Sequence, residues 1–332
     1  MDYWYTIISL ICINTVLAWS VYASFMTGTV SLGQAAFFAI GAFVSASLTA
    51  IYSWHILPAT FVGALAGALV GIAIAIPTLR LRGLYLTIAT VAFVEVVRVI
   101  FHNMKFGHEG TLAVEGSDAR QLPWIGPDGP LGFRHISYLN DNHITPGEYA
   151  FWLVVIVVGF GIYFWFLERS RLGYALRAVE EDEIAAQGVG LSHNFLKVFA
   201  FTVGAAIAAV AGSLYAHLLT FITGNDFNIP LTVMALAYVV IGGGQTFWGP
   251  LLGALIFTLL PEVARFTKEF RLEIFGTAML LTMVFRQHGL LTKALVRGFE
   301  ARIAGFFRRK HQATTAETGP TAPTLSKTKG GT

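Results

Sequence analysis

Residues 168–190 read Glu168-Arg-Ser-Arg-Leu-Gly173-Tyr-Ala-Leu-Arg177-Ala-Val-Glu180-Glu-Asp-Glu183-Ile-Ala-Ala186-Gln-Gly188-Val-Gly190. Apolar runs enclose this polar stretch on both sides, at residues 149–167 and 196–218. Each run is long enough to cross a bilayer, which takes about 20 apolar residues. The pattern predicts a membrane-embedded chain that holds one short, charged helix in water. We expect that helix to be bound by another protein.

The composition places much of the remaining surface in lipid. Only 12% of the 332 residues are charged and 55% are hydrophobic, whereas soluble domains carry about 25% charged residues. We therefore predict an all-α polytopic membrane protein with about eight to ten transmembrane helices, at least one of them broken. The pI of 9.0 does not indicate a nucleic-acid partner, because the basic residues cluster at span ends and in the tail.

Nine apolar runs are candidates for membrane spans. They cover approximately 5–25, 30–52, 57–78, 83–101, 149–167, 196–218, 231–244, 250–266 and 272–288. No basic residue precedes the first run and no clear cleavage site follows it, so we expect a retained span. Residues 1–310 are predicted to form one transmembrane domain. Residues 311–332 lack apolar periodicity and are predicted to be a disordered cytoplasmic tail.

Basic residues in short loops predict the orientation. Arg80 and Arg82 flank the fourth run, three arginines lie within 168–195, and a basic cluster follows the last run. The positive-inside rule places all three regions in the cytoplasm. The acidic 102–148 segment is then external. The basic 265–271 loop conflicts with this scheme, and the scheme requires residues 231–266 to cross twice.

A break in a helix is expected near residue 31. Ser31 and Gly33 precede Gln34 at the edge of the lipid phase. Non-helical backbone at this depth is tolerated where protein or a water-filled cavity covers it, and such breaks often line substrate paths. An ordinary loop followed by a Gly/Ala packing face explains the pattern equally well.

Glu95 and Arg98 are the ionisable pair inside the fourth span. They are three residues apart and share a helix face. The pair could belong to a translocation path. An intrahelical ion pair near the outer interface, with Arg98 extending toward water, is the favoured interpretation.

The 168–195 loop holds the candidate docking residues. Small side chains at Ala185 and Ala186 would let a partner approach the backbone closely. Gly188 and Gly190 would end the helix. An acidic run in an otherwise basic loop offers carboxylates to a basic cleft. The candidate coupling residues are Arg177, Glu180, Glu181, Asp182, Glu183, Ala185, Ala186, Gly188 and Gly190.

A glycine-rich turn lies between the seventh and eighth runs. Its density of glycine indicates a close approach of backbones or positive φ angles. We assign it a structural role, at Gly242, Gly243, Gly244, Gly249 and Pro250. It is not a phosphate-binding loop, because no Gly-Lys dipeptide occurs in the chain. Metal-site and hydrolase motifs are absent too, so we expect no catalytic residue, no metal and no bound cofactor.

Five ordered blocks resemble the permease subunits of branched-chain amino acid ABC importers, the LivM type. The blocks are Ser31–Gln34 with Phe37–Gly41, Arg80–Leu86, Arg177–Ala186 with Gly190, Gly242–Ala254, and Phe285–Leu291. They span nearly the whole chain. Leu84 stands where family members commonly have an acid, and His288 where they often have proline.

The resemblance implies a non-catalytic transport subunit in a bacterial-type inner membrane, with a cytoplasmic C-terminus. It implies a homologous second permease, two cytoplasmic ATPases that use ATP and Mg, and an extracytoplasmic substrate-binding protein. The implied substrates are leucine, isoleucine and valine, or other amino acids, amides or urea. An ion-coupled secondary transporter or an intramembrane enzyme is the alternative. A carrier is expected to bury acidic groups near the midplane, and Glu95 is the one acid well inside a span.

Overall fold

The computed structural model describes residues 2–81, 83–109, 124–134, 136, 138–263, 276, 277 and 280. The helices of this part are α1 (Asp2–Phe25), α2 (Gln34–Ala50), α3 (Ile56–Thr78), α4 (Leu84–Asn103), α5 (Tyr138–Asp141), α6 (Pro146–Arg169), α7 (Arg171–Glu181), α8 (Glu183–Gly188), α9 (His193–Leu219), α10 (Ile229–Gly242) and α11 (Trp248–Val263). Two short 3₁₀ helices, η1 (Gly129–Leu131) and η2 (Gly224–Asp226), lie in the loops.

Six helical segments of the described part are long and apolar enough to cross a membrane. They are Tyr3–Phe25, Ile56–Thr78, Leu84–Asn103, Pro146–Arg169, His193–Leu219 and Gly224–Gly242. Two shorter apolar helices, Gln34–Ala50 and Trp248–Leu260, accompany them. The expected span at 272–288 lies almost wholly outside the described residues, as do the 265–271 loop and the tail. The total of eight to ten spans therefore stays a prediction.

The described part is mostly helical, as predicted, and three short strands accompany the helices. Strands β1 (His108–Glu109), β2 (Trp124–Pro127) and β3 (Phe133–Arg134) form an antiparallel sheet in the order β1-β2-β3. Phe133 N–H donates to the carbonyl of Ile222 at 2.8 Å, which ties the sheet to the segment after α9. Short strands can form here because these residues lie beyond the ends of the apolar spans.

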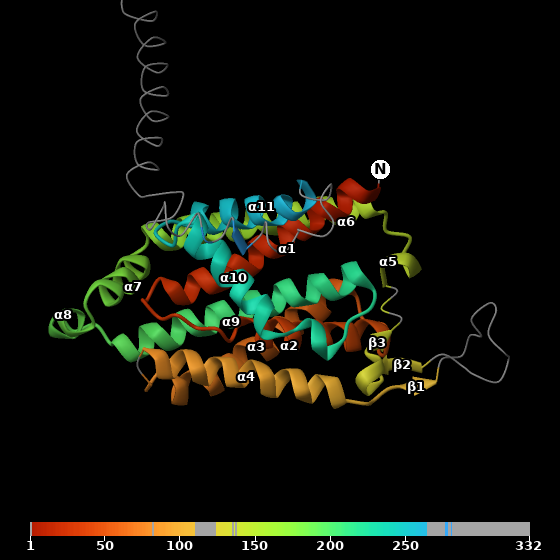
Figure 1. Cartoon of the computed structure of the whole chain (residues 1–332), viewed down its shortest axis with the longest axis horizontal. Helices are drawn as coiled ribbons and strands as arrows, with labels where there is room; N and C mark the ends of the chain where they lie inside the picture. The colour runs from red at the N-terminus through yellow and green to blue at the C-terminus, as the bar shows by residue number, and fades with distance from the viewer. Residues whose placement is uncertain are drawn as a thin grey trace, which may run out of the picture. The chain divides into compact units, whose positions relative to one another are not determined.

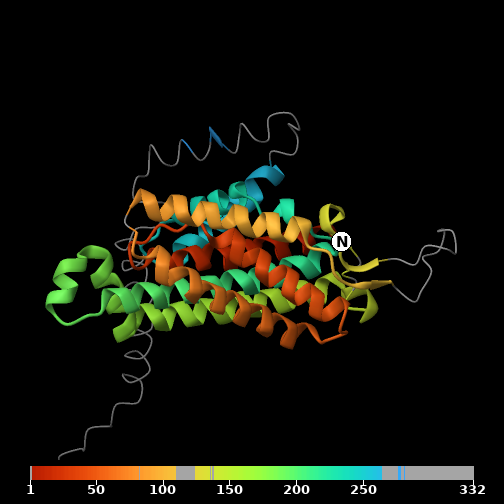
Figure 2. The ribbon, with the colours of Figure 1, turned by 90° about the horizontal axis from the view of Figure 1, so that it is seen from below.

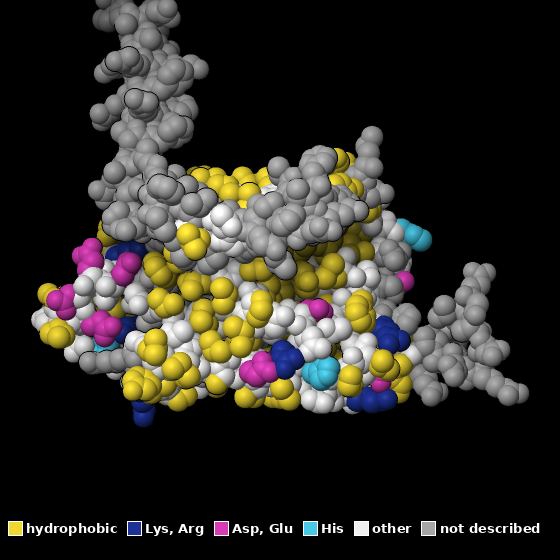
Figure 3. Space-filling view, in the orientation of Figure 1, with side chains coloured by type: hydrophobic (Ala, Val, Ile, Leu, Met, Phe, Trp, Pro, Cys, Tyr) yellow, Lys and Arg dark blue, Asp and Glu magenta, His cyan; other side chains and the backbone are white. Residues whose placement is uncertain are grey.

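The bundle has two different ends (Figures 1 and 2). Helices α7 and α8 project at one end, and the sheet with α5 lies at the other. Helices α2 and α4 both begin at the α7–α8 end and run toward the sheet. Charged side chains gather over α7 and α8, whereas the flank of the bundle is mostly apolar (Figure 3). This separation matches a chain whose middle lies in lipid.

Small residues let α2, α3 and α9 pack closely at the centre. A side chain at Gly41 would meet the Ala209 carbonyl oxygen at 1.9 Å, and one at Gly67 would meet the Ala209 Cβ at 2.5 Å. Small-residue contacts of this kind are how transmembrane helices associate. Hydrogen bonds add to them: Ser213 Oγ lies 2.7 Å from both Thr60 Oγ1 and Ser45 Oγ.

Helix ends follow the capping chemistry of the sequence. Thr145 and Glu148 form a capping box at the start of α6, with Pro146 in the first turn. Asn228 caps α10 through a 3.2 Å bond from Leu231 N–H. Helices α10 and α11 form an antiparallel hairpin, because Gly242 lies against Gly249 and Tyr238 lies against Gly253. Helix α10 starts near the sheet end of α4, where η2 packs, and the turn after it contacts α7. Residues 231–263 thus form two antiparallel helical segments. The two membrane crossings that the orientation scheme requires stay a prediction, because α11 is shorter than the six candidate spans.

Candidate functional site

The projecting segment consists of two helices, not the single helix expected over 174–190. Helix α7 ends at Glu181 and α8 begins at Glu183, with Asp182 extended between them. Asp182 Oδ1 accepts hydrogen bonds from Ile184 N–H at 2.8 Å and Ala185 N–H at 3.0 Å, so its carboxylate starts α8. Helix α8 ends at Gly188, and Gly190 has a φ of +86°, a conformation that favours glycine.

Three of the four acids have partners inside the chain, which the sequence interpretation did not foresee. Glu180 Oε2 pairs with Arg177 at 2.7 Å, Glu183 pairs with Lys197 on α9, and Asp182 caps α8. Glu181 is exposed. The acidic run therefore holds α7 and α8 on the bundle, and its surplus charge toward a partner is smaller than its sequence indicates.

Three large apolar side chains are exposed among the charged residues of α7, α8 and the turn that follows. Tyr174, Ile184 and Val189 are 67%, 81% and 78% exposed. Ala185 is exposed, but Ala186 is 3% exposed and packs within the chain. These three side chains, with Ala185, are the apolar groups that the projecting segment presents to its surroundings.

Arg177 connects α7 to the rest of the bundle. Its guanidinium donates to the Tyr22 hydroxyl at 2.7 Å and to the Gln245 carbonyl at 2.9 Å, with a longer bond to the Gly244 carbonyl. The Tyr22 hydroxyl in turn donates to Glu168 at the end of α6. Burial acts to lower the pKa of Arg177, but Tyr22, Glu180 and Glu168 outweigh it and the pKa is raised. We call Tyr22, Glu168 and Arg177 the anchor cluster.

The anchor cluster fixes the turn between α10 and α11. Glu168 Oε1 accepts a 2.8 Å hydrogen bond from Phe247 N–H on the other side of that turn. Within the turn the backbones touch: a side chain at Gly242 would meet the Gly249 carbonyl oxygen at 1.9 Å. Gly243 has a φ of +112° and Pro250 lies in the first turn of α11. The structural role assigned to these glycines agrees with this geometry.

The residues near Ser31 form an irregular segment between α1 and α2. The two helices run in opposite directions, so this segment is the ordinary loop of the alternative interpretation and not a break within one helix. Residues 29–33 are non-helical. Ser31 is 2% exposed and Gly33 is buried. Gln34 begins α2 fully buried, with Nε2 at 3.4 Å from both Ser20 O and Ser24 Oγ and with no partner for Oε1 among the described residues.

The irregular segment touches both α7 and α4. Gly28 has a φ of +71°, and a side chain there would meet the Glu180 Cα at 3.5 Å. Leu32 N–H donates to Thr90 Oγ1 of α4 at 3.1 Å. A cavity of about 640 Å³ opens beside this contact, and its lining includes Thr29, Leu86, Asp182 and Lys197. Movement of α7 and α8 would thus reach the start of α2 and the first half of α4 directly.

Glu95 and Arg98 form the intrahelical ion pair that the sequence favoured. Arg98 Nε lies 3.0 Å from both Glu95 oxygens, and Arg98 Nη1 donates to Asn225 Oδ1 of η2 at 2.6 Å. Within the described part of the chain, no hydrogen bond joins this pair to Ser31, Gly33 or Gln34, so the candidate path residues form two separate groups.

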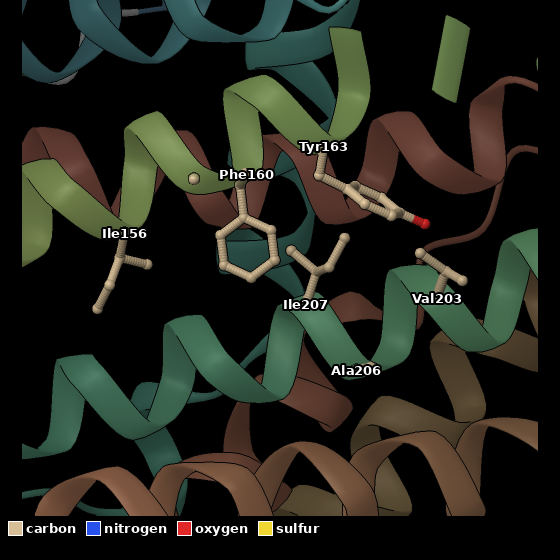
Figure 4. Close-up of a pocket in the computed structure, with 7 residues that line it drawn as sticks. Ile156, Phe160, Tyr163, Val203, Ala206 and Ile207 are labelled. Carbon is tan, nitrogen blue, oxygen red and sulfur yellow. The ribbon is translucent and has the colours of Figure 1, made fainter. Parts of the chain in front are cut away.

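A groove between α6 and α9 is the other notable hollow. Ile156, Phe160 and Tyr163 of α6 face Ala206 and Ile207 of α9 around a volume of about 450 Å³ (Figure 4). Its lining is apolar apart from the Tyr163 hydroxyl. A charged substrate would find no ionic partner there, whereas hydrocarbon would fit. Among the described residues no group of His, Cys, Asp or Glu could hold a metal ion.

Comparison with known proteins identifies the family. The family model described as the branched-chain amino acid transport system / permease component matches residues 3–286. The chain belongs to this family. It is 32% identical over 277 residues to the high-affinity branched-chain amino acid transport system permease protein LivM of Salmonella typhimurium, with 80% of this chain and 64% of the relative covered. The chain therefore spans somewhat less than two thirds of the length of that relative.

Two other relatives show the breadth of the likeness. A probable LivM of Methanocaldococcus jannaschii is 26% identical over 253 residues, covering 70% of this chain and 67% of the relative. The autoinducer 2 import system permease protein LsrC of Klebsiella pneumoniae is 30% identical over 183 residues, covering 50% of this chain and 52% of the relative. No solved structure matches. The family and the apolar helices together fit a multi-pass membrane protein.

Four residues of the permease site were not anticipated from sequence. Tyr22 and Glu168 complete the anchor cluster, Lys197 pairs with Glu183, and Asn225 holds Arg98. The sequence could have indicated Glu168, since it is an acid at the end of an apolar span. The others lie in ordinary contexts, and their partners are far away in the sequence.

Proposed function

We propose that this chain is the permease subunit of an ATP-driven importer of branched-chain, hydrophobic amino acids. It would form half of the translocation path beside a homologous permease. Its α7–α8 segment would dock on one of two cytoplasmic ATPases that use ATP and Mg, and an extracytoplasmic binding protein would deliver the substrate. The family and the LivM relatives support the substrate class.

One observation carries the coupling part of this proposal. The segment that projects beyond the bundle exposes apolar side chains at Ile184 and Val189, and is tied inward by the anchor cluster to α1, α6 and the α10–α11 turn. A docking element that merely adhered to a partner would need only the outer surface. The buried bonds supply a mechanical link from that surface to membrane-spanning helices.

Reconstitution tests the transport proposal. The full chain would be co-produced with the second permease and the ATPases, placed in proteoliposomes, and supplied with binding protein and labelled leucine. We expect uptake that requires ATP. Uptake without ATP, driven by a proton or sodium gradient, would replace this proposal with the carrier alternative.

The docking surface is tested by Ile184→Glu. This change places a charge where apolar contact with the ATPase is expected, and we predict uptake reduced by about tenfold or more, as for loss of a central interface contact. Arg171→Glu is the matched control, because Arg171 is exposed in the first turn of α7. Uptake by Ile184→Glu equal to that of the unaltered chain would show that α8 is not the docking element.

Sidedness is tested by reporter fusions. Fusions at Gln187, Gly129 and Gly319 should report inside, outside and inside, which places α7–α8 with the ATPases and the sheet with the binding protein. Any other order would reverse or break the arrangement. The inner-membrane location and the cytoplasmic C-terminus rest on the same experiment.

A further inference from the structure

The Glu95–Arg98 pair lies within the α4 span, in the half of the helix nearer the sheet. Helix α4 has 20 residues and is about 30 Å long at 1.5 Å per residue. On the same scale Glu95 lies about 16 Å along the axis from Leu84, and Arg98 about 21 Å. Both charges therefore lie well away from the α7–α8 end of the bundle, and Glu95 is close to the midpoint of the helix.

The pair is open to its surroundings at this depth. The Glu95 side chain is 45% exposed and the Arg98 side chain 28%. Figure 3 shows an acidic and a basic side chain together over α4, interrupting a mostly apolar surface. Exposed charges in hydrocarbon are costly even when paired. This face of α4 must therefore meet water or protein in the working assembly.

Both members keep unused bonding capacity. A guanidinium has five N–H donors, and the bonds to Glu95 and Asn225 engage Nε, Nη1 and Nη2 once each. Among the described residues the Glu95 carboxylate accepts from Arg98 alone, although a carboxylate can accept about four hydrogen bonds. The pair thus keeps two free N–H donors on Arg98 and a smaller remaining acceptor capacity on Glu95, side by side.

Asn225 is held in place by close backbone packing. A side chain on neighbouring Gly224 would meet His102 N at 2.6 Å and the Arg98 carbonyl oxygen at 2.9 Å. The η2 turn is therefore pressed against α4, and its amide oxygen steadies the Arg98 guanidinium.

An apolar stripe continues from the pair toward the α7–α8 end. Leu84, Ile88 and Val91 follow the same helix face at intervals of three and four residues. Leu84 is 75% exposed and Ile88 is 57% exposed. One face of α4 thus combines a charged pair with an apolar track.

We propose that Glu95, Arg98 and Asn225 form a site on the translocation path that takes the charged ends of a zwitterionic α-amino acid. The substrate carboxylate would bind the free donors of Arg98, its ammonium would bind Glu95, and its apolar side chain would lie on the Ile88 stripe. The inference rests on the proposed import function and adds a substrate site within the membrane. The site is complementary to both charges of the substrate, and so it would not favour a cation or an anion alone.

Uptake by neutral variants is the first test. Glu95→Gln and Arg98→Gln would be assembled in the full complex and supplied with binding protein loaded with labelled leucine. Loss of a charge-assisted bond to the substrate should lower uptake by about tenfold or more. Val96→Gln is the matched control, because it adds the same side chain at a 56% exposed position of α4 outside this face. Uptake unchanged in Glu95→Gln and Arg98→Gln would overturn the site.

Protection from a thiol reagent separates substrate contact from a structural effect. Asn225→Cys in a Cys12→Ala background should react with a water-soluble maleimide, and leucine-loaded binding protein with ATP should slow the reaction severalfold relative to empty binding protein. Adding Glu95→Gln should remove that difference. Equal rates with loaded and empty binding protein would overturn the proposal, as would loss of the second permease from the complex in Glu95→Gln, which would make this face a subunit contact. If the unaltered complex imports no leucine, the proposed function fails before this site is tested.

Discussion

Helices α4 and α6 both lie on the outside of the bundle, but their exposed faces differ in kind. Helix α6 exposes apolar and aromatic side chains along its length, including Phe151, Val155 and Phe166. Helix α4 exposes apolar residues as well, but it also carries the partly exposed Glu95–Arg98 ion pair. Because lipid tolerates the first face and penalises the second, the comparison separates a lipid-facing helix from one that another surface or water must cover.

The largest expected effect comes from placing a charge on the lipid-facing helix. Val155→Glu puts a carboxylate near the middle of α6, where insertion of an acid costs about 2.5–3.5 kcal/mol. We expect low yield of folded protein by size-exclusion chromatography. Ile88→Glu on α4 is the matched control, and its yield should fall much less. Similar losses in both variants would mean that α4 faces lipid too.

Water access should differ between the same two helices. In a Cys12→Ala background, Ile88→Cys should react with a water-soluble maleimide at least about tenfold faster than Val155→Cys, since thiolate chemistry needs water. The measurement is the labelling rate in the assembled complex. A faster reaction at Val155 would reverse the assignment of the two faces.

The contact between α4 and the irregular segment should have a moderate effect. Thr90→Val removes the acceptor of the Leu32 N–H and should lower stability by about 1 kcal/mol. Thermal unfolding of the detergent-solubilised subunit measures it. Thr87→Val is the control, because the Thr87 hydroxyl reaches Val30 O only at 3.5 Å. A larger loss from Thr87→Val would contradict the bond pattern.

The accessibility of Ser31 to a thiol reagent tests the same segment in a second way. Ser31 is 2% exposed, so Ser31→Cys in the Cys12→Ala background should resist the maleimide at rest and react during turnover. Protection in every nucleotide state would show that the irregular segment only packs against its neighbours.

The smallest expected effect is at a glycine of α6. A side chain at Gly159 meets nothing within 4 Å, so Gly159→Ala should raise stability by at most about 1 kcal/mol through helix propensity. The control is Gly41→Ala, where the added Cβ would meet the Ala209 carbonyl oxygen. Stabilisation by Gly41→Ala, read from the same melting curves, would contradict the close packing of α2 on α9.

Apolar length predicted the long helices well. The runs at 57–78, 149–167 and 196–218 correspond to α3, α6 and α9 within a few residues at each end. The run at 30–52 was less accurate, because residues 29–33 are non-helical and α2 begins at Gln34. Hydropathy averages over such a break, since the residues stay apolar while the backbone changes.

The candidate site shows a different limit. The sequence singled out Arg177 and the glycine turn separately. It did not predict the hydrogen bond between Arg177 and the Gln245 carbonyl, because only folding brings these residues together. The acidic run was interpreted as a surface for a partner, whereas Glu180, Asp182 and Glu183 have local partners. The family likeness leaves the roles of these residues as proposals.

The tight centre of α2, α3 and α9 has a consequence for the cell. Helices that approach closely enough for Gly41 to touch the Ala209 backbone leave no room for a string of water or ions between them. A copy inserted before its companions arrive would therefore be expected to leave the proton gradient intact. The single chain would then be impermeable to ions even before the complex has assembled.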